Sequence, residues 1–497
     1  MWTRRRMAVG AVVLAASLVA RLVWLDGAFD VTEPDELMYV HVAENFAAGV
    51  PYPRYDYETR YRDGLFVVPP FPLYTAGLVF RAFGASLYSF RALNVCWGVA
   101  GVAAFGLLAA LYLEGLPLLV ATMVFAFSPV ALRESTQALL GAPAVCFLLV
   151  SLWAYVRHVR EGRGRYLVVF ALALGATAAC KQYGVLLGAV LAVHGLWVRW
   201  RRGGPSLRRL AAGFGLAVAT FGLLVPWVFW RPRDALDLYL YQSLIAHVTG
   251  LLRGAESGPT LFAVPYPGLV AGHALVGLMG LAVFAATWRR RADAVLFYGV
   301  LLGVPILAMR QARHLSLGLP AWCLFAGYLL AAGAEWGRRS RPARVGTGLL
   351  AVLLVGSVGP AAMVPWRRPS GLAGACRFVA GHTLPGEQVL SNYWRPVIER
   401  LTGRRVPRDW LDAEARRLIA RGEVAAVILD RSVYTRRVLH TPERAATAAW
   451  VRETFPVVWA CRPAHGGSAT VYLTRGGEGK RAVGGGEGEA PTESPIR

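Results

Sequence analysis

The sequence predicts a mainly α-helical protein that crosses a membrane many times and ends in a smaller α/β domain. Of the 497 residues, 56% are hydrophobic and 17% are charged, whereas a soluble domain usually carries about 25% charged residues. The apolar residues form blocks of roughly 17 to 24, long enough to cross a hydrocarbon core about 30 Å thick. The arginines behind the net charge of +23 cluster between alternate blocks, as in cytoplasmic loops. We therefore expect membrane lipid, and no nucleic acid, as a partner.

About eleven blocks are long enough to be spans. We expect these spans at residues 7–25, 89–112, 116–132, 136–156, 166–180, 183–198, 210–230, 266–287, 293–309, 314–334 and 345–364. Three arginines precede the first block, a flank that also occurs in signal peptides. No small-residue cleavage site follows Leu25, so a retained helix with a cytoplasmic N-terminus is expected.

The charged residues between the blocks indicate one orientation. Of the five connections that follow every second span, only the short one at 113–115 lacks arginines, and the arginine-rich stretches of the other four lie at residues 157–165, 199–209, 289–291 and 338–344. Most of the carboxylates lie in the opposite connections, above all in a large loop at 26–86. This bias predicts a multi-pass protein of the cell membrane, with everything after residue 365 outside the cytoplasm.

Within the 26–86 loop, residues 69–84 are apolar but only about 16 residues long, shorter than the usual minimum for a spanning helix. The segment opens with the sequence PPFP. A full span here would turn all the later arginine-rich loops outward, so we expect an interfacial helix on the outer leaflet. The transmembrane domain then comprises residues 1–365.

Residues 366–475 are expected to form a soluble α/β domain outside the cytoplasm. Helical patterns at 410–421 and 442–455 alternate with strand patterns at 424–429, 456–461 and 469–473. The strand at 424–429 is continuously apolar, which indicates cover on both faces. Residues 476–497 are rich in glycine and glutamate and are expected to be disordered.

A group of carboxylates directly after the first span is the first candidate site. The sequence there is Thr32-Glu33-Pro34-Asp35-Glu36. Pro34 suits the first turn of a helix, which we expect to run from Asp35 to about Ala48. Asp35 and Glu36 would then lie near unpaired N–H groups that favour an ionised carboxylate. First-turn acids are also ordinary helix electrostatics, but at the mouth of a helix bundle such a carboxylate could act as a general base.

Two groups of cations on the outer side are further candidates. Lys181, one of only two lysines in the chain, lies at the outer end of a span, where a cation needs a partner. It could bind a phosphate as a point charge, with Tyr183 beside it as a hydroxyl donor, or its side chain could extend to the interface. Arg310, Arg313 and His314 could bind the same phosphate or anchor the protein at the membrane surface.

Four motifs, taken in order, resemble a known family. The acidic pair after the first span is followed by residues 69–74 (PPFPLY), by residues 180–184 (CKQYG), and by Arg313-His314-Leu315 with Pro320. Together they resemble GT-C-fold glycosyltransferases, most closely the protein mannosyltransferases and aminoarabinose transferases of glycosyltransferase family 39. The family has Arg-Tyr where this sequence has Arg313-His314. The resemblance covers about residues 1–365.

The resemblance implies an enzyme of the cell envelope that uses a sugar on a polyprenyl phosphate as donor. It implies that a first-loop carboxylate, Asp35 by motif, deprotonates an acceptor hydroxyl, which attacks the anomeric carbon with inversion. Glu36 would orient the acceptor, the base or a metal. The acceptor would be a protein, a lipid or a glycan. Further donor or acceptor contacts are expected at these residues: Glu33, Arg60, Arg62 and Tyr74.

Several absences limit the alternatives. The sequence has no phosphate-binding G-x-x-x-x-G-K-[ST] motif and no strand-linked G-x-G-x-x-G, so direct use of a nucleotide is not expected. It has no His-Glu-x-x-His or paired Cys-x-x-Cys motif, although Asp35, Glu36 and a third carboxylate could hold a divalent metal ion. A transporter or flippase of lipid-linked substrates is the main alternative, since charges within membranes also mark transport paths. A sensor or scaffold is a second alternative.

Overall fold

The computed structural model describes residues 4–27, 34–51, 53, 68–202, 206–236, 239, 267–286, 294–300, 315–338, 340–363, 371–393, 395–407, 411–430, 442–461 and 469–474. Its contacts divide the chain into two compact units. The first, here called the membrane unit, comprises Met1–Phe29 and Asp35–Arg367. The second, the C-terminal unit, comprises Asp30–Pro34 and Arg368–Arg497.

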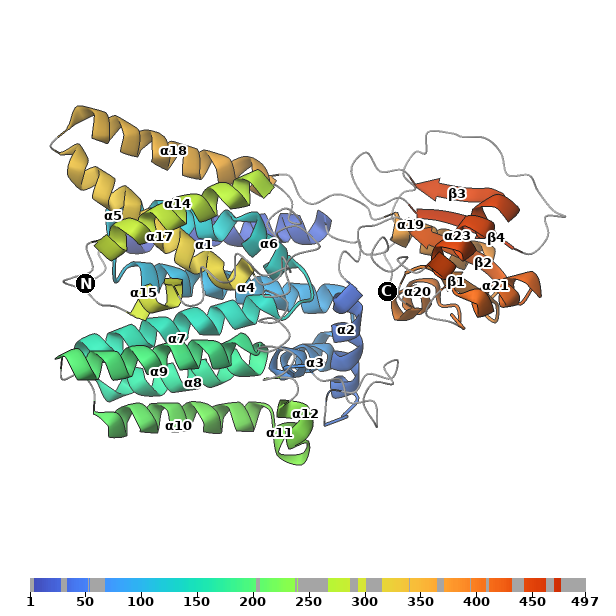
Figure 1. Ribbon diagram of the computed structural model, residues 1–497, viewed down its shortest axis with the longest axis horizontal. Coiled ribbons are helices and arrows are strands. Elements are labelled where there is room, and N and C mark those ends of the chain that lie inside the picture. Colours follow the sequence, from blue (N-terminus) through green and yellow to red (C-terminus); the bar gives the residue numbers. More distant parts are fainter. Residues whose placement is uncertain are drawn as a thin grey trace. The chain divides into compact units, whose positions relative to one another are not determined.

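The described part of the membrane unit is helical (Figure 1). In chain order its helices are α1 (Arg4–Gly27), α2 (Pro34–Ala47), α3 (Phe71–Phe83), α4 (Leu87–Ala109), α5 (Gly115–Phe127), α6 (Pro129–Thr136), α7 (Gly141–Glu161), α8 (Gly164–Cys180), α9 (Tyr183–Arg202), α10 (Leu207–Leu224), α11 (Trp227–Trp230), α12 (Pro232–Leu236), α14 (Pro267–Ala286), α15 (Ala294–Tyr298), α17 (Leu315–Gly337) and α18 (Arg341–Met363). Most of the long helices coincide with expected spans to within a few residues, and α3 lies where the interfacial helix is expected.

Among the described residues, five helices are long and apolar enough to cross a membrane, namely α1, α4, α7, α10 and α17. The pair α5 and α6 adds a sixth if its two parts, which meet at 48°, form one broken span. The prediction of a polytopic helix bundle is confirmed. The number of eleven spans stays a prediction, because part of the chain, including most of 293–309, lies outside the described residues.

The structure breaks the helix expected at 116–132. The helix α5 ends at Phe127, and α6 starts at Pro129. Ser128 between them has the extended backbone angles φ −58° and ψ 135°. A residue before proline is pushed out of the helical region because the proline ring clashes with its backbone. The bend turns α6 across one end of the bundle (Figure 1).

The helices of the membrane unit pack around one large apolar core. The rings of Phe105 in α4 and Phe125 in α5 stack with their centroids 4.6 Å apart. Gly280 of α14 lies against the backbone of Phe325 in α17, so closely that a Cβ atom there would overlap the Phe325 carbonyl oxygen. Small residues at such contacts let helix backbones approach closely, a common device between membrane helices.

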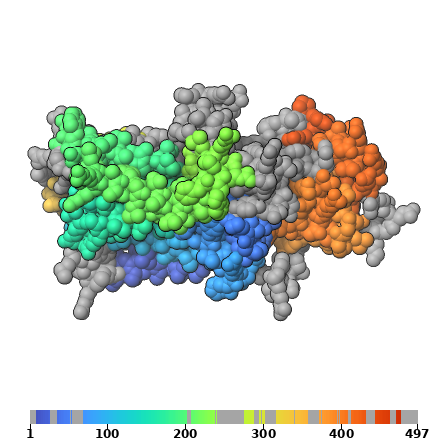
Figure 2. Space-filling model, turned by 90° about the horizontal axis from the view of Figure 1, so that it is seen from below, coloured from blue at the N-terminus to red at the C-terminus, as the bar shows by residue number. Residues whose placement is uncertain are grey.

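One face of the membrane unit is strongly apolar. Figure 2 shows α10 and α11 (green) along this face, and their exposed side chains include Val218, Leu223, Phe229 and Trp230. Leu223, for example, keeps 81% of its surface exposed. An exposed apolar surface of this kind marks a membrane contact, in agreement with the polytopic class.

The C-terminal unit has an α/β fold. Its strands β1 (Gln388–Ser391), β2 (Val424–Asp430), β3 (Val457–Cys461) and β4 (Ala469–Leu473) form one sheet in the order β1-β2-β4-β3. The pair β1–β2 is parallel, with Val389 opposite Ala426, and the other two pairs are antiparallel. Every residue of β2 is buried, as its continuous apolar run predicts.

Four helices surround this sheet: α19 (Leu372–His382), α20 (Arg395–Thr402), α21 (Ala413–Ala420) and α23 (Pro442–Thr454). Ile419 of α21 and Val451 of α23 belong to the same buried apolar cluster as Val427 of β2. Phe378 of α19 stacks on Trp459 of β3, with ring centroids 6.2 Å apart. The expected strands at 424–429, 456–461 and 469–473 are present, whereas β1, α19 and α20 were not predicted. The tail at 476–497 lies outside the described residues.

Candidate active site

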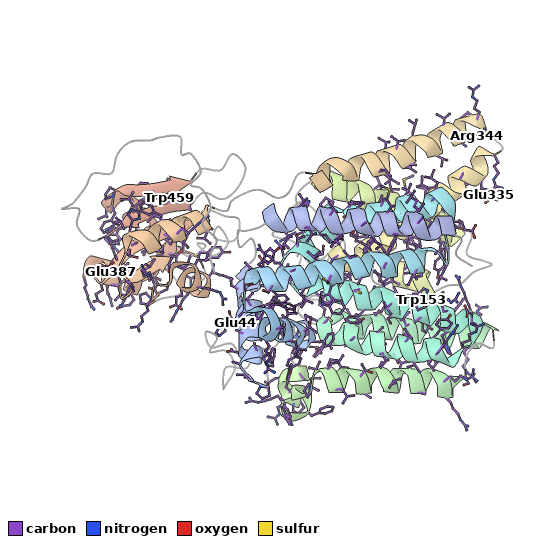
Figure 3. All side chains as sticks on the ribbon, turned by 180° about the vertical axis from the view of Figure 1, so that it is seen from behind. Glu44, Trp153, Glu335, Arg344, Glu387 and Trp459 are labelled. Carbon is purple, nitrogen blue, oxygen red and sulfur yellow. The ribbon has the colours of Figure 1, made fainter. Side chains whose placement is uncertain are left out.

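The acidic motif lies at one end of the membrane unit, which we call the α2 end. The helices α2, α3 and α6 gather there (Figure 1), and Figure 3 shows Glu44 of α2 at the end opposite to Trp153, Glu335 and Arg344. The helix α2 starts at Pro34 and carries Asp35 and Glu36 in its first turn, as predicted. It ends at Ala47, shortly before Gly49, whose φ of 97° suits glycine.

Glu36 forms a fully buried ion pair with Arg91 of α4. The Arg91 Nε and Nη2 atoms donate to Glu36 Oε1 and Oε2, each at 2.9 Å. The exposed fractions of these side chains are 0% for Glu36 and 3% for Arg91. The backbone N–H of Ala138 donates to Glu36 Oε1 at 2.8 Å. The carboxylate therefore joins α2 to α4 and to the segment 137–140 between α6 and α7.

Asn94 holds the same segment from the next turn of α4. Its Nδ2 atom donates to the carbonyl oxygens of Gln137 at 2.6 Å and Leu139 at 2.7 Å. Residues three apart lie on one face of a helix, so Arg91 and Asn94 act together. The start of α2 and the segment before α7 are thereby fixed to α4.

Asp35 differs from Glu36 in its surroundings. It lies in the same first turn of α2, but its side chain is only half-buried. Because Glu36 is committed to Arg91 and Ala138, Asp35 is the better placed of the two acids to reach a substrate. Both acids lie where the sequence predicts, and the structure shows that Glu36 is paired with Arg91 and with the Ala138 N–H.

Lys181 lies at the end of α8, also at the α2 end. It is the C-cap residue of this helix, and its N–H donates to the Thr177 carbonyl oxygen at 2.9 Å. Its side chain is 8% exposed. The helix α3 contacts α8, and its Tyr74 ring lies 4.2 Å from the ring of Phe46 in α2. The short helix α3 therefore contacts both α2, which carries Asp35, and α8, which ends at Lys181.

Tyr74 contributes to packing at this end. Its hydroxyl donates to the Pro51 carbonyl oxygen at 3.3 Å, and burial raises the pKa of Tyr74 to about 12. The phenol therefore stays protonated. Arg81 of α3 donates to the carbonyl oxygens of Phe46 and Ala47 at 3.1 and 2.8 Å, which stabilises the C-terminal end of α2.

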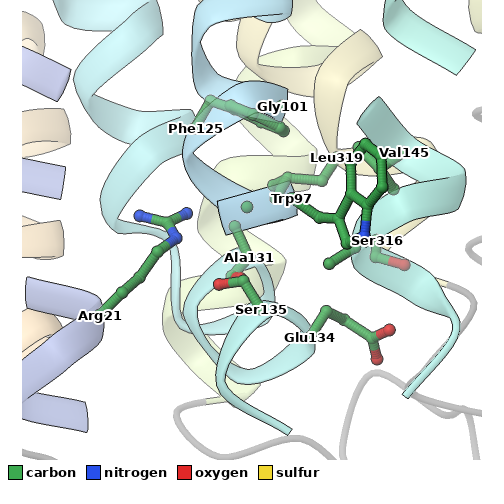
Figure 4. Close-up of a pocket in the computed structure, with 12 residues that line it drawn as sticks. Arg21, Trp97, Gly101, Phe125, Ala131, Glu134, Ser135, Val145, Ser316 and Leu319 are labelled. Carbon is green, nitrogen blue, oxygen red and sulfur yellow. The ribbon is translucent and has the colours of Figure 1, made fainter. Parts of the chain in front are cut away.

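A small cavity lies among the helices α1, α4, α6 and α17 (Figure 4). It has a volume of about 20 Å³, enough for one water molecule. Its lining includes Arg21 of α1, Trp97 of α4, Glu134 of α6 and Ser316 of α17. Arg21 Nη1 donates to the Ala126 carbonyl oxygen at 3.1 Å and to Ser17. This arginine therefore stabilises the backbone at the break between α5 and α6.

Close contact between α4 and α6 keeps this arrangement in place, and Gly98 permits it. A Cβ atom on Gly98 would overlap Ser135 Cβ of α6 and lie 2.8 Å from Arg21 Nε. We expect Gly98→Ala to destabilise the protein by on the order of 1–3 kcal/mol, as overpacking usually does. Thermal unfolding in detergent measures the change.

Gly106 provides the matched control, because it also lies in α4 but a Cβ atom there meets nothing within 4 Å. Gly106→Ala should be neutral or stabilising, since alanine favours the helix by about 1 kcal/mol. Equal effects of the two substitutions would contradict the role of Gly98 in the contact between α4 and α6.

The described residues include only part of the predicted site. Glu33, Arg60, Arg62, Arg310, Arg313 and His314 lie outside them, as does the side chain of Tyr183. Arg21, Arg91, Asn94 and Glu134 are not among the site residues predicted from the sequence. A charged or polar residue within or at the outer end of an apolar span is the signal for these positions, since such a residue needs a buried partner.

The hydrogen bonds that Glu36 accepts do not favour a metal ion at its carboxylate. Both of its oxygen atoms accept hydrogen bonds from Arg91, and one of them accepts a third from Ala138. Among the described residues, no three His, Cys, Asp or Glu side chains are grouped as metal ligands.

Known structures share this fold over nearly the whole chain. ArnT from Cupriavidus metallidurans bound to undecaprenyl phosphate aligns with a TM-score of 0.61 and 15% identity, over 93% of this chain and 97% of that chain. The oligosaccharyltransferase from Archaeoglobus fulgidus in the apo form aligns with a TM-score of 0.62 and 14% identity, over 89% and 71%. The oligosaccharyltransferase AglB from the same organism, in complex with an inhibitory peptide and a dolichol-phosphate, aligns with a TM-score of 0.59 and 13% identity, over 90% and 72%.

The chain therefore has the GT-C fold of these structures, built as a polytopic helix bundle. Residues 67–230 match the family model described as dolichyl-phosphate-mannose-protein mannosyltransferase. This match includes α3 and the segment 137–140. No curated protein matches the sequence. The resemblance to protein mannosyltransferases and aminoarabinose transferases is confirmed.

Proposed function

We propose that the protein transfers a sugar from a polyprenyl-phosphate donor to an acceptor hydroxyl, outside the cytoplasm and with inversion. The observation that carries the proposal is the pair of acids at the start of α2, of which Glu36 is fixed by Arg91 while Asp35 is half-buried beside it. The matched family model and the polyprenyl phosphates in two structural neighbours support this class of donor.

In the proposed reaction Asp35 is the general base. The acceptor oxygen attacks the anomeric carbon while its proton moves to the Asp35 carboxylate. The bond between the anomeric carbon and the phosphate oxygen breaks, and polyprenyl phosphate leaves with the bonding electrons. Glu36 keeps the first turn of α2 in place, which holds the base at the distance that the reaction needs.

Lys181 is the proposed cation for the donor phosphate. A charge-assisted hydrogen bond to phosphate is stronger than a neutral one, and the low exposure of Lys181 strengthens it further. The arginine-rich connections lie at the opposite end of the proposed topology, on the cytoplasmic side. The N-terminus is then cytoplasmic and the C-terminal unit lies outside the cytoplasm.

A transfer assay tests the proposal. The full-length protein, purified in detergent, is incubated with a radiolabelled polyprenyl-phosphate sugar and with candidate protein, lipid and glycan acceptors. A glycosyltransferase releases polyprenyl phosphate and labels an acceptor. If the protein instead moves the donor across a proteoliposome membrane without cleaving it, the function is transport and the proposal is wrong.

Replacement of Lys181 tests the phosphate contact. We expect Lys181→Met, which keeps an apolar stem but removes the charge, to weaken donor binding by about tenfold or more, since hydrogen bonds to charged groups contribute roughly 1.5–3 kcal/mol. Lys181→Arg keeps the charge and should retain part of the affinity. Equilibrium binding of a fluorescent polyprenyl phosphate measures both, and unchanged affinity in Lys181→Met would exclude this role.

A further inference from the structure

The turn between α7 and α8 lies at the end of the membrane unit opposite to α2, here called the turn end. Gly162, with a φ of 69°, closes this turn, and its N–H donates to the His158 carbonyl oxygen at 2.8 Å. Residues 157–165 contain four arginines and one glutamate, a net charge of +3 if histidine is neutral. The tight turn brings these arginines together.

Two of the guanidinium groups meet at one phenol. Arg157 Nη2 donates to the Tyr166 hydroxyl oxygen at 2.7 Å, and Arg165 Nη2 donates to the same oxygen at 3.2 Å. Both groups also lie over the ring, 5.0 and 4.9 Å from its centroid. Like charges repel each other, so an anion between or beside them would stabilise this arrangement.

A third arginine is fixed at the neighbouring turn. Arg160 Nη1 donates to the Leu111 carbonyl oxygen at 3.0 Å, and the guanidinium lies 4.7 Å from the Tyr112 ring centroid. Glu161 pairs with Arg157 at 2.7 Å and with Arg163 at 3.6 Å. This single carboxylate balances only one of the four positive charges.

The start of α8 adds to the positive potential. Its N-cap residue Arg163 makes no side-chain cap, and its first turn has no acidic residue. The unpaired N–H groups of a helix N-terminus attract anions. Arg157 and Arg165 therefore meet at Tyr166 beside this positive helix end, with Arg160 and Arg163 in the same turn region.

Apolar side chains continue from this place along the helix. Val168 and Leu172, four residues apart on α8, keep 46% and 47% of their surface exposed. The ring of Trp153 packs edge-on to Tyr166 with centroids 5.6 Å apart, and aromatic rings of this kind are enriched at the membrane–water interface. A ligand with a charged head and apolar chains matches both parts of the surface.

We propose that the α7–α8 turn binds the phosphate headgroup of an anionic glycerophospholipid, with Arg157 and Arg165 as the main contacts. Basic pockets at the cytoplasmic ends of membrane helices are a known mode of lipid-headgroup recognition. The acyl chains lie along Val168 and Leu172. In the proposed orientation this lipid belongs to the cytoplasmic leaflet, far from the transfer site. The site is independent of the transfer reaction.

Native mass spectrometry of the full-length protein tests the proposal. The detergent-purified protein is stripped of lipid and titrated with phosphatidylglycerol or with zwitterionic phosphatidylcholine. We expect R157Q/R165Q to retain phosphatidylglycerol at least about tenfold more weakly than the unchanged protein, with phosphatidylcholine binding unaltered. Tyr166→Phe, which keeps the ring but removes the shared acceptor of the two arginines, should give a smaller loss and serves as the test if the double variant does not fold.

R199Q/R201Q is the matched control, because it removes the same charge from the end of α9, where Arg201 lies 4.7 Å from the Trp200 ring centroid. It should retain phosphatidylglycerol normally. Equal losses in the two double variants, or no loss in R157Q/R165Q and Tyr166→Phe, would overturn the proposal. Displacement of phosphatidylglycerol by millimolar inorganic phosphate would also overturn it, since the site would then bind a soluble anion.

Discussion

Asp35→Asn should reduce sugar transfer by about 10²- to 10⁴-fold, the usual contribution of a general base. The amide keeps the size of the side chain but cannot accept the proton of the acceptor hydroxyl. Release of polyprenyl phosphate from a radiolabelled donor measures the rate. Donor affinity should stay near its original value, because in our proposal the donor phosphate binds at Lys181.

Glu44→Gln is the matched control for this experiment. Glu44 also lies in α2, and its carboxylate is 3.8 Å from His41 Nδ1 of the same helix. The control variant should keep the original rate. Normal transfer by Asp35→Asn would show that another group is the base, whereas loss of donor binding together with the rate would indicate a disrupted fold instead of a lost base.

Arg91→Met should destabilise the protein by about 3–5 kcal/mol, because removal of one partner leaves the charge of a buried ion pair uncompensated. Glu36 has an exposed fraction of 0%, so water cannot replace the two hydrogen bonds from Arg91. The start of α2 and the segment 137–140 should loosen together. Thermal unfolding in detergent, with proteolysis at the start of α2, measures the effect.

A double-mutant cycle separates the contribution of the ion pair to stability from that of the surrounding residues. The variant with both Glu36→Gln and Arg91→Met removes both charges and should recover much of the stability that Arg91→Met loses. Arg417→Gln is the exposed control, because Arg417 pairs with Glu414 at 3.1 Å while 69% of its side chain is exposed. Its effect should stay within about 1 kcal/mol. A loss in Arg91→Met no larger than in this control would contradict the structural role of the pair.

The two largest predictions concern adjacent residues with different expected consequences. Asp35→Asn should remove activity and leave stability unchanged. Loss of the Glu36–Arg91 pair should lower stability first and activity as a result. The neighbouring acids, which look alike in the sequence, thus differ because one lies against Arg91 and the other is half-buried.

Much of the fold follows from the sequence because the membrane imposes simple rules on it. Backbone N–H and C=O groups have no water partners in hydrocarbon, so a long apolar block must form a helix. The blocks near α1, α4, α7 and α17 therefore predicted these helices well. The start of α2 at Pro34 was predictable too, since proline and first-turn acids are local signals. In the C-terminal unit, the apolar run of β2 indicated a covered strand.

The contacts between residues far apart in the chain could not be predicted from these local signals. Glu36 and Arg91 are 55 positions apart, and Ala138 is a further 47 positions along the chain. The sequence shows the charge of Glu36 but not its buried partner Arg91, which lies on another helix. The break at Ser128 also escaped prediction, since a proline near the end of an apolar block can either kink a helix or end it.

The sequence alone determined that this chain is a polytopic membrane protein with acids at the start of one helix and arginines between alternate helices, because hydropathy, charge bias and helix-start signals are local properties. Only the tertiary structure decided which acid is buried in an ion pair, how α4 fixes α2 and the segment 137–140, and where arginines converge on Tyr166. Burial and pairing depend on side chains that the fold brings together from distant parts of the chain.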